Sequence, residues 1–376
     1  MDEESARLPE PASDISAYLI AGRVVSELPD GPRSQTAART PAQGIQDGVD
    51  AEQIGFRRVF LSERYNLKEA GAFLGGVAAR TSRLELGTGV ITPWSRHPLL
   101  AAALGATMHA CYGPRFILGL GRGMHVMTRG VRDTSFQALI DYARILKRLW
   151  AGETVSYDGP AGTYDAIALD DRYHGPAPQI WTANWGGPKA CDAAADPAFD
   201  AVILSPFLTP DAVHAAATNV RTGCERRDRD PGTVRVCHPI VTAPDLDDDE
   251  TRELAHARVV TYFQVQAATY IRQNGWDPEI VNSIVHHQQF AKLQRTTADQ
   301  SFHRSELRGP AGLVPDSWMR ESAAIGSVRD CVRTLRTFRD AGADEIITYG
   351  STPAQNADLV AAWLASQYRA PEHAPA

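Results

Sequence analysis

Eight short apolar segments, each followed by a helical segment, constrain the fold more than any other feature of this chain. The predicted strands cover residues 17–23, 57–62, 84–91, 116–120, 179–183, 201–204, 234–241 and 345–349. Helical periodicity follows each of them, at residues 36–54, 69–80, 98–112, 134–150, 188–195, 210–226, 328–341 and 354–366. Because the strands are apolar on both faces, they are typical of a parallel sheet covered by helices. Eight alternating units predict an α/β protein with a (β/α)8 TIM barrel.

Two helix ends and one long excursion complete the predicted domain organisation. Gly55 and Gly342 each stand directly after a helical segment, where glycine is the preferred C-terminal cap. We expect flexible tails at residues 1–14 and 369–376 around a single barrel domain, residues 15–368. Within it, residues 244–326 separate the seventh strand from its helix, and the spacing of their apolar residues predicts a helical cap. A smaller excursion covers residues 152–178.

Charge and cysteine content exclude several classes of partner. The chain has 376 residues, a formal net charge of -7 and a pI near 5.9, which argues against nucleic acid or an anionic membrane as partner. No segment has the run of about 18 apolar residues that a membrane helix needs, and the acidic first fourteen residues do not resemble a signal peptide. The five cysteines are far apart and odd in number, which predicts reduced thiols in a cytoplasmic protein and no metal site.

Glycines gather at the ends of the third and fourth predicted strands. The segment LELGTGVITPWSRHP contains Gly87 and Gly89, and FILGLGRG contains Gly119, Gly121 and Gly123. In a barrel of this kind, the carboxyl ends of the strands form the active-site face. Two neighbouring strand ends without side chains suggest a flat slot for a planar ring. The alternative is a bulge that only closes the barrel rim.

A third glycine-containing strand end suggests an anion site. The segment NWGGPKA, residues 184–190, follows a predicted strand and opens a helix with Pro188 in its first turn. Backbone N–H groups at such a helix start suit a phosphate. A glycine pair in an ordinary loop is the alternative. A Rossmann dinucleotide site is rejected, because LGLGRG fits the G-x-G-x-x-G spacing only when the pattern is stretched.

Longer segments resemble the luciferase-like monooxygenase superfamily, in order and from about residue 15 to 366. They read AEQIGFRRVFLSER, AARTSRLELGTGVITPWSRHPLLAAALGATM, GPRFILGLGRG, IWTANWGGPKACDAAA and GSVRDCVRTLRTFRDAGADEIITYG. The segments SERYNLKEA and MHACYGPRF resemble those of the branch described as coenzyme F420-dependent oxidoreductases. The resemblance implies a barrel that holds a flavin or 5-deazaflavin at its C-terminal face, and a homodimer.

The same resemblance implies which residues meet the cofactor. Matching the motifs places a non-prolyl cis peptide at Gly89–Val90 and the phosphate side of the cofactor at residues 184–187. Together with the glycine slot, the predicted cofactor contacts are Gly87, Gly89, Val90, Gly121, Arg122, Gly123, Asn184, Trp185, Gly186, Gly187, Leu204 and Ser205.

Catalytic candidates follow the second and fourth strands. Sugar-phosphate dehydrogenases of the superfamily carry an Asp-His pair after strand two and a Glu after strand four, where this chain has Glu63-Arg64 and Met124. Arginine does not release a proton at ordinary pH, so oxidation of a sugar phosphate is not predicted. We take Glu63, Arg64 and His125 as the catalytic candidates. The alternative for Glu63 and Arg64 is an ion pair at the rim.

Other residues have structural interpretations beside functional ones. His97 precedes Pro98 at a helix start, where capping is the simpler role. Tyr65, Trp94 and Trp185 are candidates for the wall of the slot, or else for packing. The histidines of the long excursion show no metal spacing, and residues 247–250 are typical of a helix N-terminus rather than of a calcium loop.

Our leading hypothesis is an F420-dependent oxidoreductase that transfers a hydride between the deazaflavin and a small organic substrate. A reduced-FMN-dependent monooxygenase is the rival enzyme, and a non-catalytic flavin- or F420-binding protein is the third hypothesis. The substrate and the direction of transfer are not predicted, because the long excursion that shapes the pocket has no recognisable motif.

Overall fold

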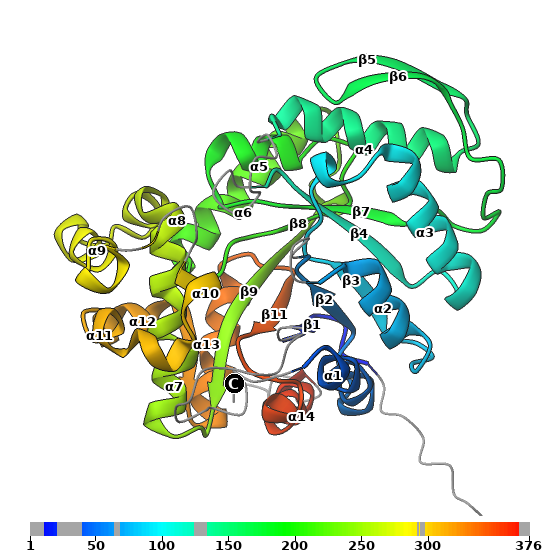
Figure 1. Ribbon diagram of the computed structural model, residues 1–376. Helices are drawn as coiled ribbons and strands as arrows, with labels where there is room; N and C mark the ends of the chain where they lie inside the picture. The colour runs from blue at the N-terminus through cyan, green and yellow to red at the C-terminus, as the bar shows by residue number, and fades with distance from the viewer. Residues whose placement is uncertain are drawn as a thin grey trace, which may run out of the picture.

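The computed structural model describes residues 11–20, 40–63, 68–123, 134–291, 293 and 298–367 of the chain. Its centre is a closed barrel of eight parallel strands, with helices around it (Figure 1). The strands are β1 (Ile15–Tyr18), β2 (Arg58–Leu61), β3 (Glu85–Thr88), β4 (Phe116–Gly121), β7 (Gln179–Ala183), β8 (Ala201–Ile203), β9 (Arg235–Pro244) and β11 (Glu345–Tyr349). Pairing runs from β11 through β1, β2, β3, β4, β7 and β8, and the β8–β9 and β9–β11 pairs close the ring. The predicted TIM barrel is confirmed.

The outer helices occupy the predicted positions to within a few residues. They are α1 (Pro41–Ile54), α2 (Ala70–Ala78), α3 (Pro98–Tyr112), α4 (Phe136–Trp150), α5 (Pro188–Ala194), α6 (Pro210–Glu225), α13 (Val328–Asp340) and α14 (Ala357–Gln367). Gly55 caps α1 at φ 101°, and Gly342 follows α13 at φ 107°, so both helix ends use the left-handed conformation as predicted. Side-chain caps fix the starts of others, for example Ser135 on the N–H of Ala138 in α4.

The segment between β9 and β10 is helical. It contains α7 (Asp248–Leu254), α8 (His256–Asn274), α9 (Pro278–Val285), α10 (Ala298–Ser301), α11 (Arg308–Ala311) and α12 (Asp316–Ser322), which gather on one side of the barrel (Figure 1). Asp247 caps α7 through the N–H of Glu250, which confirms the interpretation of residues 247–250 as a helix N-terminus. We call this segment the insertion.

Three strands were not predicted. The four-residue β10 (Ala323–Gly326) extends the sheet beside the end of β9, and it is too short to give a periodic signal. The excursion at residues 152–178 contains an antiparallel hairpin, β5 (Val155–Gly159) and β6 (Gly162–Ile167). The hairpin was missed because its side chains are mostly exposed and mixed in character, so no apolar alternation marks it.

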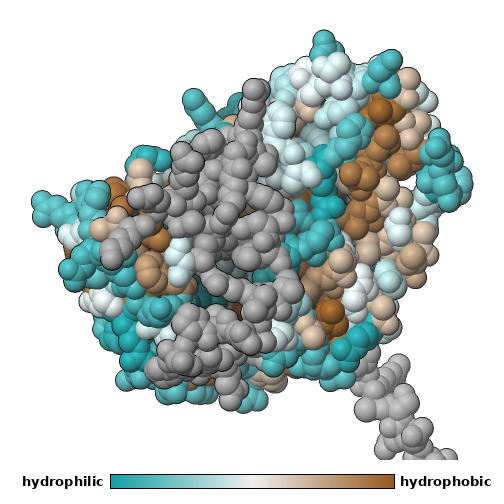
Figure 2. Space-filling view, viewed as in Figure 1, coloured by the Kyte–Doolittle hydropathy of each residue, from teal (hydrophilic) through white to brown (hydrophobic). Residues whose placement is uncertain are grey.

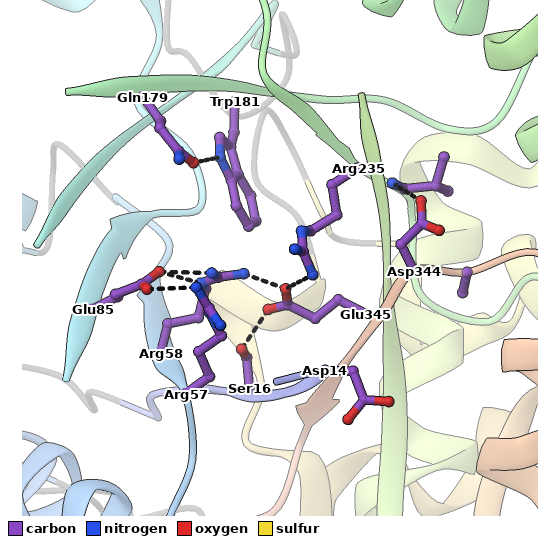
Figure 3. Close-up of polar contacts among 12 residues, drawn as sticks. Asp14, Ser16, Arg57, Arg58, Glu85, Gln179, Trp181, Arg235, Asp344 and Glu345 are labelled. Carbon is purple, nitrogen blue, oxygen red and sulfur yellow. Dashed lines mark hydrogen bonds and ion pairs between the residues drawn. The ribbon is translucent and has the colours of Figure 1, made fainter. Parts of the chain in front are cut away.

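A buried ion network closes the N-terminal end of the barrel (Figure 3). Arg58, the first residue of β2, contacts Glu345 at the start of β11 and Glu85 at the start of β3. Its side chain is 3% exposed, that of Glu345 is 0% exposed, and the Arg58 guanidinium lies 4.8 Å from the ring centroid of Trp181. Ser16 donates a further hydrogen bond to Glu345. Since these groups lie at strand starts, opposite the carboxyl ends, we assign them to stability rather than to catalysis.

Candidate functional site

The rims of β3 and β4 lie side by side at the carboxyl end of the barrel, as predicted. Leu86 and Gly87 pair with Phe116 and Ile117, and beyond the ladder Ile91 bridges to Leu120. The peptide bond Gly89–Val90 is cis, as the resemblance implies. Strand β3 therefore ends at Thr88, three residues earlier than predicted, because the chain leaves the regular ladder at Gly89.

Two hydroxyl groups converge on the carbonyl oxygen of Gly89. Ser62 Oγ donates to it at 2.7 Å from the end of β2, and the Tyr18 hydroxyl donates at 3.0 Å from the end of β1. Burial, which is the largest cause, raises the pKa of Tyr18 far above its ordinary value, so this phenol is a neutral donor. Sequence reasoning missed both residues. Ser62 ends the predicted second strand, which was an available signal. Tyr18 lay near the start of the predicted first strand, residues 17–23, and only the structure ends β1 there.

The glycines of β3 and β4 make room for the protein's own atoms, which corrects the idea of a bare flat slot. A Cβ atom on Gly87 would lie 2.5 Å from the ring of Phe60, and one on Gly89 would lie 2.4 Å from the Tyr18 hydroxyl. A Cβ atom on Gly121 would lie 2.3 Å from Val90 Cγ2. Strand residues this close to neighbouring side chains must be glycine. The surface of this rim is thus formed by Val90 and the Gly89 carbonyl, with Tyr18 beneath them.

The loop after β7 contains buried amide groups without partners in the described part of the chain. Asn184 Oδ1 accepts the N–H of Gly186 at 2.7 Å, which shapes the turn, whereas Asn184 Nδ2 is buried and makes no hydrogen bond there. Gln273 of α8 comes close to Gly186, and its Oε1 atom is likewise buried without a donor. Gly187 starts α5 without a side-chain cap. Buried polar atoms of this kind normally have a partner, which the described residues do not supply for these two atoms.

The end of β8 is covered by the insertion. Leu204 is 2% exposed and lies in the core, and the Ser205 hydroxyl shares a 2.7 Å hydrogen bond with the hydroxyl of Tyr270 in α8. Trp185 packs edge-to-face against Tyr262 and Tyr270. The predicted contacts after β7 and β8 are therefore brought together under one helix.

Glu63 is held in an ion pair, which was the alternative to a catalytic role. Its Oε2 atom accepts hydrogen bonds from Arg96 at 2.6 Å and from the N–H of Ala70 at 3.1 Å, and its side chain is 5% exposed. Arg96 also pairs with Glu69. Burial lowers the pKa of Arg96 and the two carboxylates raise it, with a net increase. The ion pair predicted as the alternative was between Glu63 and Arg64, and Arg96 was not predicted as a partner.

Two catalytic candidates, Arg64 and His125, lie outside the described residues, as do Tyr65 and Met124. Arg122 is described: its Nε atom donates to the carbonyl of Thr134, and its guanidinium lies 4.3 Å from the ring centroid of Phe136. Gly123, the last described residue before the gap, has φ 77°.

A groove of about 250 Å³ opens beside the β3 rim. Its lining includes Trp94, Arg96, His97 and Tyr164, so the β5–β6 hairpin forms one wall. His97 Nδ1 accepts the N–H of Leu99 and caps α3, which confirms the capping interpretation. Trp94 is 40% exposed at the groove, and Tyr164 meets the His97 ring edge-to-face.

The described residues contain neither a cluster of metal ligands nor a membrane-spanning helix. No group of three or more His, Cys, Asp or Glu side chains there is arranged to hold a metal ion. In the same part of the chain, no helix combines the length and the apolar character needed to cross a bilayer.

Known proteins resemble this chain over most or part of its length. It is 26% identical over 302 residues to the 5,10-methylenetetrahydromethanopterin reductase of Methanolobus tindarius, covering 79% of this chain and 86% of that protein. It is 35% identical over 147 residues to the F420-dependent glucose-6-phosphate dehydrogenase of Microbacterium testaceum, covering 35% and 44%.

The fold matches that of the coenzyme F420-dependent tetrahydromethanopterin reductase of Methanopyrus kandleri, with a TM-score of 0.75 at 18% identity, over 96% of this chain and 100% of that one. The family model of luciferase-like monooxygenases matches residues 24–345. The chain therefore belongs to the luciferase-like monooxygenase family.

Proposed function

We propose that this protein is an F420-dependent oxidoreductase that transfers a hydride between the deazaflavin and a small organic substrate. The observation that carries the proposal is the Gly89 carbonyl, fixed by Ser62 and Tyr18 beside the rim of β4 at the active-site end of a barrel of this family. The choice of F420 over FMN is supported by the names of the relatives, a reductase and a dehydrogenase, one of them F420-dependent. A reduced-FMN monooxygenase is the second candidate, because the family name describes that activity.

The residues at the carboxyl ends of the barrel strands fit such a cofactor. The buried Asn184 amide needs an acceptor, and the Gln273 carbonyl oxygen needs a donor. A phosphate and hydroxyl groups on the cofactor would satisfy both. We propose that the cofactor is held by Gly89, Val90, Gly121, Arg122, Gly123, Asn184, Trp185, Gly186, Gly187, Leu204 and Ser205. Gly87 is proposed as a contact through its backbone alone, because Phe60 occupies the space beside its Cα atom.

When bound, the deazaflavin supplies or accepts the hydride at C5 of its ring. The chain's own contribution is orientation and exclusion of water. Ser62 and Tyr18 keep the Gly89 carbonyl in one position, and α8 covers the ends of β7 and β8. Glu63 acts as a positioning residue that fixes Arg96. Arg64 and His125 remain our candidates for contact with the substrate.

Fluorescence titration of the purified protein with F420 and with FMN tests the proposal. We expect F420 to bind more tightly, and Asn184→Ala to weaken F420 binding about tenfold, because one charge-assisted hydrogen bond is lost. Asn282→Ala in α9 is the matched control, since that side chain is exposed and belongs to another helix. The affinity of this variant for F420 should equal that of the wild type. Tighter binding of FMN, with oxygen consumption, would favour the monooxygenase. A protein that binds neither cofactor would contradict both candidates.

We also propose that the protein is a homodimer that associates through α2 and α3. Neither helix contains an Asp, Glu, Lys or Arg residue, and Leu100 of α3 is 63% exposed. Hydrophobic residues gather over α3 on the surface (Figure 2). Such a patch is typical of a protein interface. Light scattering should give twice the chain mass for the wild type and a single chain mass for Leu100→Glu, and a wild-type monomer would contradict this interface.

A cytoplasmic location is our proposal for the compartment. All five cysteines are free thiols in the structure, and Cys191, Cys224, Cys237 and Cys331 are buried. Unpaired thiols suit a reducing compartment. Detection of the protein in a secreted fraction with oxidised cysteines would contradict this assignment.

A further inference from the structure

The insertion brings a positive charge onto the mouth of the barrel. Arg258 of α8 donates from Nη1 to the hydroxyl of Tyr349 at 2.8 Å, and its guanidinium carbon lies 4.4 Å from the centroid of the same ring. Tyr349 ends β11, and its ring meets that of Tyr18 edge-to-face at 5.2 Å. Tyr18 in turn contacts the Gly89 carbonyl. Arg258 is thus connected through two tyrosines to the proposed cofactor rim.

Tyr262, one turn further along α8, completes this cluster. Its hydroxyl lies 2.8 Å from that of Tyr349, and its ring packs against Trp185 of the β7 loop. Burial, the largest cause, raises the pKa of Tyr262 well above its ordinary value, so its hydroxyl remains neutral and able to donate. The cluster therefore offers one guanidinium and neutral hydroxyl groups at one place.

The charge of Arg258 is not balanced by any carboxylate of the described residues. Two other arginines of the insertion are paired, since Arg252 lies 3.4 Å from Asp316 and Arg308 lies 3.6 Å from Asp249. Arg272, Arg304 and Arg320 have no carboxylate partner among the described residues, but unlike Arg258 none of them makes a contact with Tyr349 at the end of β11. Arg258 makes no such ion pair there, and its Nε atom is buried without a hydrogen-bond acceptor. Arg258 is half-buried, and a partly desolvated cation without a counter-charge is stabilised by an anion supplied from outside.

We propose that Arg258 binds an anionic group, a carboxylate or a phosphate, on the substrate. The inference rests on the proposed function, because it places the substrate between the cofactor rim and α8. A guanidinium binds either group through parallel N–H donors, and whichever of the Tyr262 and Tyr349 hydroxyls does not donate to the other can contribute one further hydrogen bond. The insertion therefore selects substrates by charge, whereas the barrel rim holds the cofactor.

Paired ligands that differ only in charge test this assignment on the full-length protein. The probes are benzoate, its neutral analogue benzamide, and inorganic phosphate, with dissociation constants taken from ligand-induced shifts in thermal unfolding, with and without F420. We expect the wild type to bind benzoate tenfold to a hundredfold more tightly than benzamide. If phosphate raises the unfolding temperature more than benzoate does, the anionic group of the substrate is assigned as a phosphate. If benzoate raises it more, the group is assigned as a carboxylate.

Variants then locate the effect. Arg258→Gln should remove the preference for the anion, Arg258→Lys should keep part of it, and Arg252→Gln, a paired and exposed arginine of the same insertion, should keep all of it. The Lys variant guards against a simple loss of folding. The inference is overturned if the wild type does not distinguish benzoate from benzamide, or if Arg258→Gln retains the preference.

Titration of the same variants with F420 separates this inference from the proposed function. Arg258→Gln should bind F420 with wild-type affinity, and a tenfold loss would show that Arg258 contacts the cofactor instead, which overturns the inference. If the wild type prefers benzoate through Arg258 but binds no F420, the anion site stands and the proposed function fails.

Discussion

Replacing Arg58 by alanine is expected to lower the free energy of unfolding by about 3–5 kcal/mol. The variant leaves the Glu345 carboxylate, which is fully buried, without its main counter-charge. Arg235 remains within 3.3 Å of the same carboxylate, but its side chain is 37% exposed and its charge is partly screened by solvent. Urea denaturation followed by circular dichroism measures the change, with the midpoint as the quantity compared.

The adjacent arginine is a matched control. Arg57 also pairs with Glu85, at 3.0 Å, but its side chain is 35% exposed. Arg57→Ala should therefore change the free energy of unfolding by less than about 1 kcal/mol. Equal effects of the two substitutions would refute the assignment of this network to stability through burial.

Gly119→Ala is expected to destabilise the barrel by at least about 2–3 kcal/mol. A Cβ atom on Gly119 would lie 1.8 Å from the carbonyl oxygen of Thr88, a backbone atom in the neighbouring strand. Thr88 Oγ1 also exchanges hydrogen bonds with the N–H and carbonyl groups of Gly119, both at 2.8 Å, so the strands cannot separate without breaking them. Thermal unfolding of the variant should begin well below that of the wild type.

A second glycine gives the opposite expectation. Gly75 lies within α2, where a Cβ atom would meet nothing within 4 Å. Gly75→Ala should raise the free energy of unfolding by about 0.5–1 kcal/mol, because alanine favours the helix and restricts the unfolded chain. If Gly119→Ala were as stable as Gly75→Ala, the close approach of β3 and β4 would be wrong.

The difference between these two glycines is not visible in the sequence. Gly75 and Gly119 are both surrounded by apolar residues, and only the pairing of β3 with β4 brings Thr88 O against one of them. The prediction of a bare slot failed for the same reason. A glycine in a strand indicates that space was needed at its position, but it does not indicate what fills that space. Here Phe60, Tyr18 and Val90 fill it from other segments of the chain.

Local patterns were enough for the barrel itself. The order of strands and helices follows from apolar periodicity, and Gly55 and Gly342 end their helices through a backbone preference that belongs to glycine alone. The cis bond at Gly89–Val90 was anticipated from a motif. The strand order and the helix caps depend on neighbours in the chain, so the order of residues determines them, whereas the cis bond was implied by the resemblance to the family.

The polar contacts at the carboxyl end of the barrel were decided by the tertiary structure. Tyr18 and Ser62 meet at the Gly89 carbonyl, and Glu63 meets Arg96, across separations of 27 to 71 residues. Arg258 reaches Tyr349 from 91 residues away, out of an insertion with no recognisable motif. Hydrogen bonds and ion pairs between distant segments form only after the barrel has closed, because they depend on three-dimensional distance. Periodicity records which side of an element is buried, and it contains no information on which polar groups will face each other there.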